Sequence, residues 1–478
     1  MPTSTNKRSA PPENGTPRRT LRLREAVTLI VGLVIGAGIF KTPAIVAGMT
    51  GNTTIMFGVW VLGGIISLIG ALCYAELATA YPDAGGDYHF LQRAYGRSVS
   101  FLFGWARLSV ITTGSIALLG FVFGDYMNRI FPLDFFGTGS GPFLYAVSII
   151  LILSWLNLKN IRTGMKTQTL FTGLQILCLL TIVGTATYLF FSGTAANPVQ
   201  PVTTSPSIPL SSGFGLAMVF VLLTFGGWNE AAYISAELKD GHRNMVKALV
   251  FSIAVITSLY LLVTWAYWEG LGFVGMTFSQ TIAADLMHMA FGEAAQKIIS
   301  LMIAISALTS INATIIVGAR TSYAMGRDWP ALRKLGVWDT ARDTPVNALW
   351  VQCIASLFLV TLGTLIGGGF KSMVEFTAPV FWLFFLLAGI SLFILRHREP
   401  SAPRPFKVPF YPILPLIFCL TCAGMLWSSL SYVYDQSLGG INAAWIGVAV
   451  LLLGVLLLWI INRIHPERKH PAPSVDTL

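Results

Sequence analysis

Long apolar stretches alternate with short polar connections along the chain after about residue 25. Each stretch approaches the roughly 20 residues that a helix needs to cross the hydrocarbon core of a bilayer. The pattern predicts twelve membrane-spanning helices, spans 1 to 12, at residues 26–48, 55–78, 99–123, 142–158, 167–191, 212–237, 246–268, 294–320, 346–366, 374–395, 411–432 and 443–462. The expected fold class is therefore all-α, a polytopic membrane protein.

Composition supports a lipid-embedded chain and argues against several function classes. Hydrophobic residues make up 54% of the 478 residues, charged residues make up 11%, and the mean hydropathy is +0.69. A soluble fold cannot bury so large an apolar fraction. The sequence contains no GxxxxGKS/T phosphate loop, no HExxH and no GxSxG motif, so ATP hydrolysis and covalent catalysis are not expected. We expect a membrane protein that is not an enzyme and carries no cofactor.

Positive charge is distributed unequally between the two sides of the predicted membrane. An even number of spans places both termini on one side, and all but five of the 31 Lys and Arg residues then belong to that side. The exceptions are Lys41, Arg107, Arg129, Lys297 and Lys371. Because cytoplasmic connections are enriched in Lys and Arg, we expect cytoplasmic termini in a plasma (inner) membrane protein. This asymmetry accounts for the net charge of +10 without a nucleic-acid partner.

The five cysteines all lie inside apolar spans, at Cys73, Cys178, Cys353, Cys419 and Cys422. The last two form a CxxC, but no histidine or second cysteine pair flanks it, so helix packing is favoured over metal or redox chemistry. No cysteine lies in an outer connection, which argues against a disulfide-linked companion chain. Whether the chain has a partner subunit or forms homo-oligomers stays open.

Two spans carry glycine where an uninterrupted helix would carry Leu or Ile. Span 1 contains "LIVGLVIGAGIFKTPAIVAG" (29–48), with a glycine–alanine–glycine run at its middle. Span 6 reads "GFGLAMVFVLLTFGGWNEAAYISAEL" (213–238) and is interrupted by two consecutive glycines. Glycine also lets two membrane helices approach closely, and for either break taken alone that packing explanation is equally acceptable.

The spacing of the two breaks favours a functional explanation. Spans 1 and 6 are five apart, and because five is odd, a repeat of spans 1–5 in spans 6–10 must be inverted in the membrane. Inverted repeats with discontinuous helices in matching positions are typical of secondary transporters. We expect a 5+5 inverted repeat plus two extra helices. Its segments are a disordered basic tail at 1–24, a core at 25–432 with repeats 25–191 and 212–395 and helix 11 at 411–432, helix 12 at 443–462, and a cytoplasmic tail at 463–478.

A helix that stops in mid-membrane leaves backbone N–H and C=O groups without partners. Such groups cost several kcal/mol each in hydrocarbon, so a break persists only where it lines a cavity. The free N–H groups and positive dipole in span 1 suit a carboxylate, and the free carbonyls in span 6 suit an ammonium group. An α-amino acid carries both charges a short distance apart. The two breaks together therefore predict an amino acid site.

Four segments also resemble the amino acid–polyamine–organocation (APC) superfamily. "GLVIGAGIFKTPA" resembles its span-1 motif, and "CYAELATAYPDAGGDYHFLQRAYG" (73–96) resembles its span-2 signature. "FGGWNEAAYISAELKDGHRNM" (225–245) resembles a segment of the L-type amino acid transporters within it, and "RPFKVPFYPILP" (404–415) is similar to the connection into span 11. The resemblance covers residues 25 to 430 and implies the leucine-transporter fold.

The resemblance implies a substrate site built mainly from backbone. The carboxylate would meet the amides of Gly36, Ala37, Gly38 and Ile39. The amino group would meet carbonyls in the stretch Leu223, Thr224, Phe225 and Gly226. Leu223 stands where relatives often have a gating aromatic residue, so Phe220 or Phe225 is expected to cover the site instead.

Polar residues near the breaks have two interpretations. Glu230 stands where L-type members commonly carry Tyr; a carboxylate there would hold a cationic substrate or carry a proton, or it would pair with Arg107 on span 3, which we favour. Asn229 matches a family position. Lys41 is expected near the outer mouth and solvated, and Glu76 is expected to have a scaffold role in the inner connections.

The coupling ion stays open. Many family members place a Lys on span 5, and alignment puts Gln175 there, which cannot be protonated. In sodium-coupled members of the fold, a Thr–Ser pair on span 8 joins span-1 carbonyls around one ion; the corresponding residues are Ser306, Thr309 and Ser310 with Gly32 and Ile35. Hard oxygen ligands suit sodium, whereas the same hydroxyls also bond back to their own helix. Uncoupled exchange, sodium symport and a proton carried elsewhere all remain alternatives.

The sequence thus predicts a transporter that moves amino acids by alternating access, with neutral amino acids as the first substrate class. Cationic amino acids or a polyamine form the alternative, because of Glu230. An ion channel and a membrane enzyme are the alternatives from other classes, and both are disfavoured.

Overall fold

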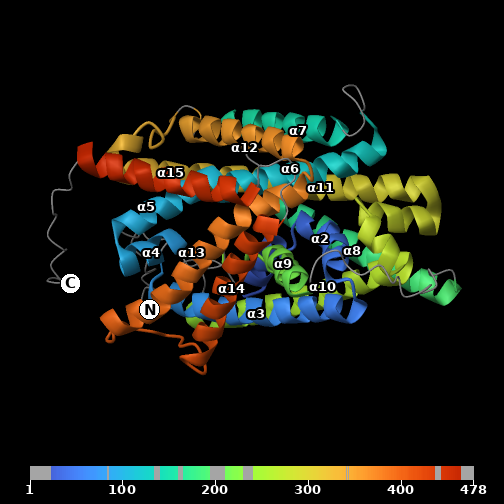
Figure 1. Ribbon diagram of the computed structural model, residues 1–478, viewed down its shortest axis with the longest axis horizontal. Coiled ribbons are helices and arrows are strands. Elements are labelled where there is room, and N and C mark those ends of the chain that lie inside the picture. Colours follow the sequence, from blue (N-terminus) through green and yellow to red (C-terminus); the bar gives the residue numbers. More distant parts are fainter. Residues whose placement is uncertain are drawn as a thin grey trace, which may run out of the picture.

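The computed structural model describes residues 23–82, 86–133, 140–159, 165–193, 210–229, 241–340, 342, 344–435 and 443–464. The described chain is built from helices; many of the long ones lie roughly along the horizontal axis of Figure 1, whereas Phe370–Arg398 and Ile413–Asp435 cross that axis at a steep angle. Their bounds in the first half are α1 (Leu23–Val34), η1 (Ala37–Phe40), α2 (Thr42–Thr50), α3 (Thr53–Ala80), α4 (Asp87–Tyr95), α5 (Arg97–Ala106), η2 (Arg107–Ile111), α6 (Thr112–Ile130), α7 (Ser140–Leu158) and α8 (Met165–Ser192). Those in the second half are α9 (Leu210–Thr224), α10 (Gly241–Phe278), α11 (Ile282–Asp328), η4 (Pro330–Leu332), α12 (Val346–Ile366), α13 (Phe370–Arg398), α14 (Ile413–Asp435) and α15 (Ala443–Ile464).

Ten helices of the described chain are long and apolar enough to cross a membrane. They correspond to the predicted spans 2, 3, 4, 5, 7, 8, 9, 10, 11 and 12. The two predicted spans missing from this set are 1 and 6, which are the two that glycine interrupts. Span 1 consists of α1, the short 3₁₀ helix η1 and α2, and the described part of span 6 consists of α9 and the turn that follows it. The all-helical polytopic fold is confirmed.

Helix packing follows the expected inverted repeat. The outer half of span 1 (α2) packs against span 6 (α9), span 2 (α3) against span 7 (α10), span 3 (α6) against span 8 (α11), and span 4 (α7) against span 9 (α12). Spans 1 to 4 therefore each contact the counterpart five positions later in the chain. The secondary contacts match as well: α1 packs on α10 as α9 packs on α3, and α8 packs on α11 as α13 packs on α6.

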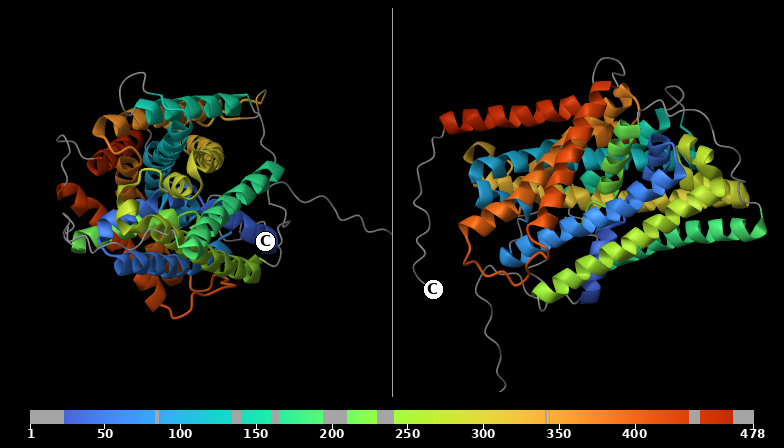
Figure 2. Two further views of the ribbon diagram at one scale, coloured as in Figure 1. Left: turned by 90° about the vertical axis from the view of Figure 1, so that its right-hand side faces the viewer. Right: turned by 60° about the horizontal axis from the view of Figure 1, so that its bottom comes forward.

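Burial separates the core spans from those at the edge. The helix from Arg97 to Ile130 is the most buried of the ten: 72% of its 18-residue apolar segment is buried inside the bundle. Ala444–Ile464 is the least buried, with 28%. The end-on view in Figure 2 shows helices surrounding the middle of the bundle, and α15 lies along an edge in the tilted view. Large apolar side chains such as Phe358, Trp427 and Trp459 are more than half exposed, as expected for a surface that faces lipid.

The ends of spans 7 and 8 differ from the prediction. The sequence pattern ended span 7 at 268 and began span 8 at 294, whereas α10 continues to Phe278 and α11 already begins at Ile282. Gly272 and Gly292 have φ angles of 67° and 77° inside these helices, so each helix bends sharply there. The segment 273–291 forms a helical hairpin at the end of the bundle, a bend that glycine permits because it tolerates positive φ.

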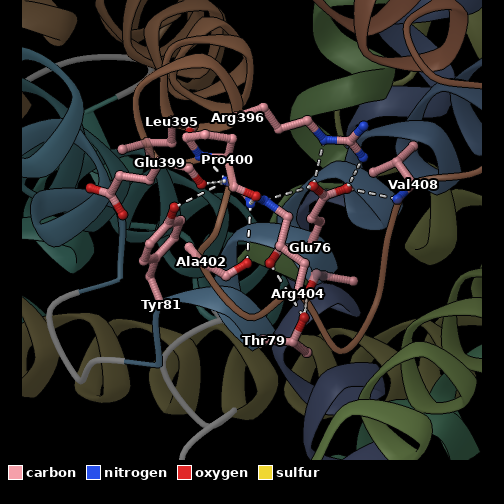
Figure 3. Close-up of polar contacts among 11 residues, drawn as sticks. Glu76, Thr79, Tyr81, Leu395, Arg396, Glu399, Pro400, Ala402, Arg404 and Val408 are labelled. Carbon is pink, nitrogen blue, oxygen red and sulfur yellow. Dashed lines mark hydrogen bonds and ion pairs between the residues drawn. The ribbon is translucent and has the colours of Figure 1, made fainter.

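A buried carboxylate joins three segments at the membrane face where α3 and α13 end (Figure 3). Glu76 of α3 has no exposed surface. It accepts two hydrogen bonds from Arg396, at 2.7 and 2.5 Å, and one from the Val408 backbone at 2.7 Å, while Arg404 lies 3.7 Å away. The span-2 signature and the connection into span 11 therefore meet at this residue. The scaffold role expected for Glu76 agrees with these contacts.

Replacing Glu76 tests how strongly this network holds the fold. Glu76→Gln leaves two guanidinium groups around a neutral amide, and removing one partner of a buried ion pair costs about 3 kcal/mol of unfolding free energy. The matched control is Glu399→Gln, because Glu399 forms a similar bidentate pair with Arg93, at 2.9 and 2.8 Å, but is partly exposed. Its loss should cost only about 0–1 kcal/mol. Thermal melting in detergent gives both values; equal effects of the two substitutions would contradict the structural importance of Glu76.

Candidate functional site

The break in span 1 exposes backbone amides near the centre of the helix bundle. α1 ends at Val34, and the Gly36 amide donates to the Val34 carbonyl at 2.7 Å, which closes a tight turn. Gly36 is extended, with φ −97° and ψ −177°, and no side chain caps the 3₁₀ helix that follows. The amides of Ala37, Gly38 and Ile39 occupy the first positions of this short helix, where no intrahelical acceptor precedes them. Three of the four predicted carboxylate-binding amides are thus at a helix start.

The break in span 6 exposes carbonyl groups. α9 ends at Thr224, the Phe225 amide donates to the Val221 carbonyl at 2.9 Å, and the Gly226 amide donates to the Leu223 carbonyl at 3.0 Å. Gly227 has a φ angle of 112°, a region that L-residues rarely adopt. The chain therefore turns away from the helix axis, and the last carbonyls of α9 lack the amides of a following helical turn.

The two breaks lie against each other. Thr224 at the end of α9 donates its hydroxyl proton to the Phe220 carbonyl at 2.8 Å, so Thr42 of α2 must be the donor in the 2.7 Å bond between the two threonine hydroxyls. A Cβ placed on Gly38 would lie 3.4 Å from the Thr224 hydroxyl. The predicted amide and carbonyl groups of spans 1 and 6 are consequently brought together, as Figure 1 shows for α2 and α9.

Tyr260 on α10 joins the two breaks, and the sequence analysis did not identify it. Its hydroxyl lies 3.0 Å from the Val34 carbonyl and 3.2 Å from the Thr224 carbonyl. Val34 ends α1 and Thr224 ends α9, so one phenol shares its proton between the last carbonyls of both half-helices. The same helix carries other polar residues, such as Tyr267 and Glu269. Nothing in the sequence pattern relates residue 260 to either break.

The predicted gating rings are both buried. The ring of Phe225 packs against Trp60 at 6.1 Å and Tyr260 at 5.1 Å between centroids, on the side of spans 2 and 7. Phe220 has 1% exposure. Asn229 is 6% exposed, and its side-chain oxygen accepts from the Gly227 amide at 3.3 Å, which supports the turn. Glu230 lies outside the described residues, so its pairing with Arg107 stays a prediction.

The candidate coupling residues are brought together in part. Gln175 on α8 donates its side-chain amide to the Ser306 hydroxyl on α11 at 2.8 Å, and both side chains are buried. Thr309 and Ser310 donate to the carbonyls four residues earlier on their own helix, at 2.9 and 3.2 Å. Ile35 is fully buried and its amide completes the last turn of α1; Gly32 lies one turn earlier. Because Thr309 and Ser310 donate their hydroxyl protons within α11, their oxygen lone pairs stay available to another partner.

The burial of Lys41 differs from the expectation. The sequence analysis placed this residue near an outer mouth and in solvent, whereas only 7% of it is exposed. Its ammonium lies 2.5 Å from Asp125 on α6 and 2.5 Å from the Gln280 carbonyl. The expectation failed because hydropathy locates a charge along a span but not the partner that a neighbouring helix supplies.

This fold and site define a class of protein. Two half-helices that meet inside an inverted repeat of membrane helices are the geometry of a leucine-transporter-type secondary transporter. Among solved structures, a manganese transporter of Eremococcus coleocola, solved as a point mutant, superimposes with a TM-score of 0.55 and 13% identity. The match covers 92% of this chain and 94% of that one. At this identity the similarity concerns the fold alone.

Sequence comparison then identifies the family. The family model described as amino acid permease matches residues 21–460, and the chain belongs to this family. It is 26% identical to Asc-type amino acid transporter 1 of Mus musculus, over 95% of this chain and 83% of that protein. It is 29% identical to large neutral amino acids transporter small subunit 2 of the same species, over 92% and 80%. It is 28% identical to b(0,+)-type amino acid transporter 1 of Homo sapiens, over 86% of this chain and 82% of that protein.

These matches confirm the resemblance to the APC superfamily and its L-type branch. The chain is a multi-pass amino acid transporter and not an enzyme, because the whole matched family consists of permeases. An amino acid is accordingly its substrate class.

Tyr260→Phe tests the link between the two breaks. The substitution removes one hydroxyl and no ring contact, so we expect a loss of about 1 kcal/mol in unfolding free energy but at least a tenfold loss in transport rate, because both half-helix ends lose a fixed partner. Tyr145→Phe is the control: Tyr145 donates to the Phe131 carbonyl at 2.8 Å near the end of span 3, far from either break in the chain. If both variants transport at the same rate, Tyr260 has no role in the site.

Proposed function

We propose that this protein exchanges neutral L-amino acids across the plasma membrane by alternating access, with both termini in the cytoplasm. One observation carries the proposal: the end of α9 touches the start of the outer half of span 1, through Thr42, Thr224 and Gly38. Backbone amides of span 1 and carbonyls of span 6 would therefore face one small volume. The Leu223 and Thr224 carbonyls each accept one hydrogen bond there, from the Gly226 amide and the Tyr260 hydroxyl, and each keeps a second lone pair for a ligand. An α-amino acid supplies a carboxylate for the amides and an ammonium group for the carbonyls.

The chemistry of the two breaks favours a neutral side chain. The sequences "IGAGIF" at 35–40 and "LTFGGWN" at 223–229 contain no ionisable residue. Backbone groups would then neutralise both charges of the zwitterion, and no side chain of these segments would remain to neutralise a third charge. The names of two relatives, large neutral amino acids transporter small subunit 2 and Asc-type amino acid transporter 1, support an amino acid substrate. Glu230 motivates the second candidate, a cationic amino acid or polyamine.

Exchange without a coupling ion is the proposed mode. Gln175 places a neutral amide, bonded to Ser306, where many family members carry a lysine. Thr309 and Ser310 donate their protons within α11, and their oxygen lone pairs stay available to a cation. Sodium symport through these oxygens is the competing mode, and a proton carried elsewhere is the third. A counterflow measurement in sodium and in choline separates exchange from sodium symport.

Counterflow in proteoliposomes tests substrate and mode together. Vesicles preloaded with an unlabelled neutral amino acid should accumulate the labelled one, at the same rate in sodium and in choline, because the exchange moves no ion. Uptake that requires sodium would replace exchange by symport. If lysine, arginine or a polyamine competed better than leucine, serine or alanine, the neutral-substrate proposal would be wrong. Empty vesicles are the control and should take up little label.

Gly36→Ala tests whether the ligand approaches the span-1 backbone. The backbone of Gly36 suits any L-residue, and the nearest atom to an added Cβ is the Val34 carbonyl oxygen at 3.9 Å. Folding should therefore be preserved, while the methyl group occupies space that a bound amino acid needs. We expect KM to rise about tenfold or more, since a ligand displaced by a methyl group loses its charge-assisted bonds.

The matched control for Gly36→Ala is Gly184→Ala on α8, where an added Cβ meets nothing within 4 Å. Its KM and melting temperature should equal those of the wild type. An unchanged KM in Gly36→Ala, measured with protein that melts normally, would place the substrate elsewhere.

A further inference from the structure

A cavity of about 420 Å³ lies beside the outer half of span 1. α2, the end of α6, the α10–α11 connection and the start of α13 line it. Glu76 binds Arg396 near the opposite end of α13, so the cavity is at the membrane face away from the Glu76 network. Its volume falls within the range of small-molecule sites, about 300–1,000 Å³. The cavity thus offers room for a ligand outside the two breaks.

The cavity contains a pair of opposite charges, of which Lys41 is buried and the Asp125 side chain is 23% exposed. Lys41 caps the start of α2, three residues after Gly38, and only 7% of it is exposed. Its ammonium binds the Asp125 carboxylate and the Gln280 carbonyl, each at 2.5 Å. All three residues line the cavity. An ammonium group has three donors, and the two named oxygens use two of them.

We propose that Lys41 and Asp125 form an outer subsite that receives the zwitterionic head of an amino acid on its way to the two breaks. The subsite rests on the proposed function and extends it. The incoming carboxylate replaces Asp125 on Lys41, and the incoming ammonium group replaces Lys41 on Asp125. No covalent bond forms or breaks, and two ion pairs take the place of one.

This exchange of partners selects for zwitterions. A buried charge left without its partner is strongly unfavourable. A simple amine would separate the pair and leave Lys41 unneutralised, and a simple carboxylic acid would leave Asp125 unneutralised. An α-amino acid neutralises both. The subsite therefore discriminates by head group. Of the other lining residues only Lys371 is charged, and its ammonium lies 3.8 Å from the Glu375 carboxylate.

The subsite is also connected to the outer hairpin of residues 273–291. Lys41 holds the hairpin through the Gln280 carbonyl, and Arg129 of α6 donates to the Thr281 hydroxyl at 2.8 Å. Positive φ angles at Gly272 and Gly292 mark the two ends of this hairpin. A ligand bound between Lys41 and Asp125 would lie directly under it.

The double variant Lys41→Met/Asp125→Asn tests the subsite without leaving a buried charge unpaired. Transport is measured in sealed membrane vesicles of both orientations. Substrate offered from the cavity face should show a KM raised about tenfold with an unchanged maximal rate, because uniform binding is lost. The KM from the opposite face should stay at the wild-type value. The amine that lacks the carboxylate of the substrate should compete with substrate uptake better in the variant than in the wild type. This change should appear only when both are offered from the cavity face, because no lysine is left unneutralised there.

Two comparisons keep the result interpretable. Lys297→Met is the control, because Lys297 pairs with Glu293 at 2.7 Å on the first full turns after Gly292 and is about half exposed; both KM values should be unchanged. Lys41→Gln/Asp125→Asn retains hydrogen-bonding groups and replaces the first variant if that one melts early.

The outcomes distinguish the two proposals. A KM that changes equally from both faces, or from neither, refutes the subsite while amino acid exchange by the wild type stands. Absence of amino acid transport by the wild-type protein overturns the proposed function and the subsite with it. A rise confined to the cavity face supports both.

Discussion

Satisfying the peptide groups of two helices that stop inside the membrane is the constraint on which the structure depends. Hydrocarbon offers no hydrogen-bond partner, so every exposed N–H or C=O needs one from the protein, from water or from a ligand. Tyr260 supplies one phenol to the last carbonyls of both half-helices. Tyr126 of α6 donates to the Phe40 carbonyl at 2.8 Å, at the end of the short 3₁₀ helix. Spans 3 and 7 therefore support the break from two sides.

The two membrane faces are held together in different ways. At the face where α3 ends, Glu76 is fully buried and receives hydrogen bonds from a guanidinium group and a backbone amide. At the other face, Lys41 and Asp125 meet at the wall of a cavity. A carboxylate with several rigid partners is costly to separate, whereas the proposed subsite requires the Lys41–Asp125 pair to be exchanged for the two charges of a ligand. The Glu76 network suits a permanent connection between segments, and the Lys41–Asp125 pair suits a site that a substrate occupies on its way through the protein.

Hydropathy alone predicted most of the fold, for a physical reason. A lipid-embedded segment must satisfy its own backbone, so each span is a continuous apolar helix that can be recognised without knowing its neighbours. The two interrupted spans, 1 and 6, could also be recognised, because glycines at positions 36, 38, 226 and 227 permit a break in the helix. The parity of the two breaks then required an inverted repeat, and the packing of α3 on α10 and of α6 on α11 agrees with it. The ends of spans 7 and 8 were missed because the hairpin helices at 273–291 are separated from the spans by single glycines, which hydropathy averages away.

The sequence by itself determined that this chain is an all-helical, multi-pass membrane protein and where two of its helices break. Only the tertiary structure decided which side chains serve the breaks. Tyr260 reaches Val34 across 226 positions, Lys41 reaches Gln280 across 239, and Gln175 reaches Ser306 across 131. The reason is that apolar periodicity records how a segment meets lipid, a local property, whereas a polar contact inside the bundle depends on which helices pack together and in what rotation. A lysine expected in solvent is buried for that reason, and its partner could not be read from its own span.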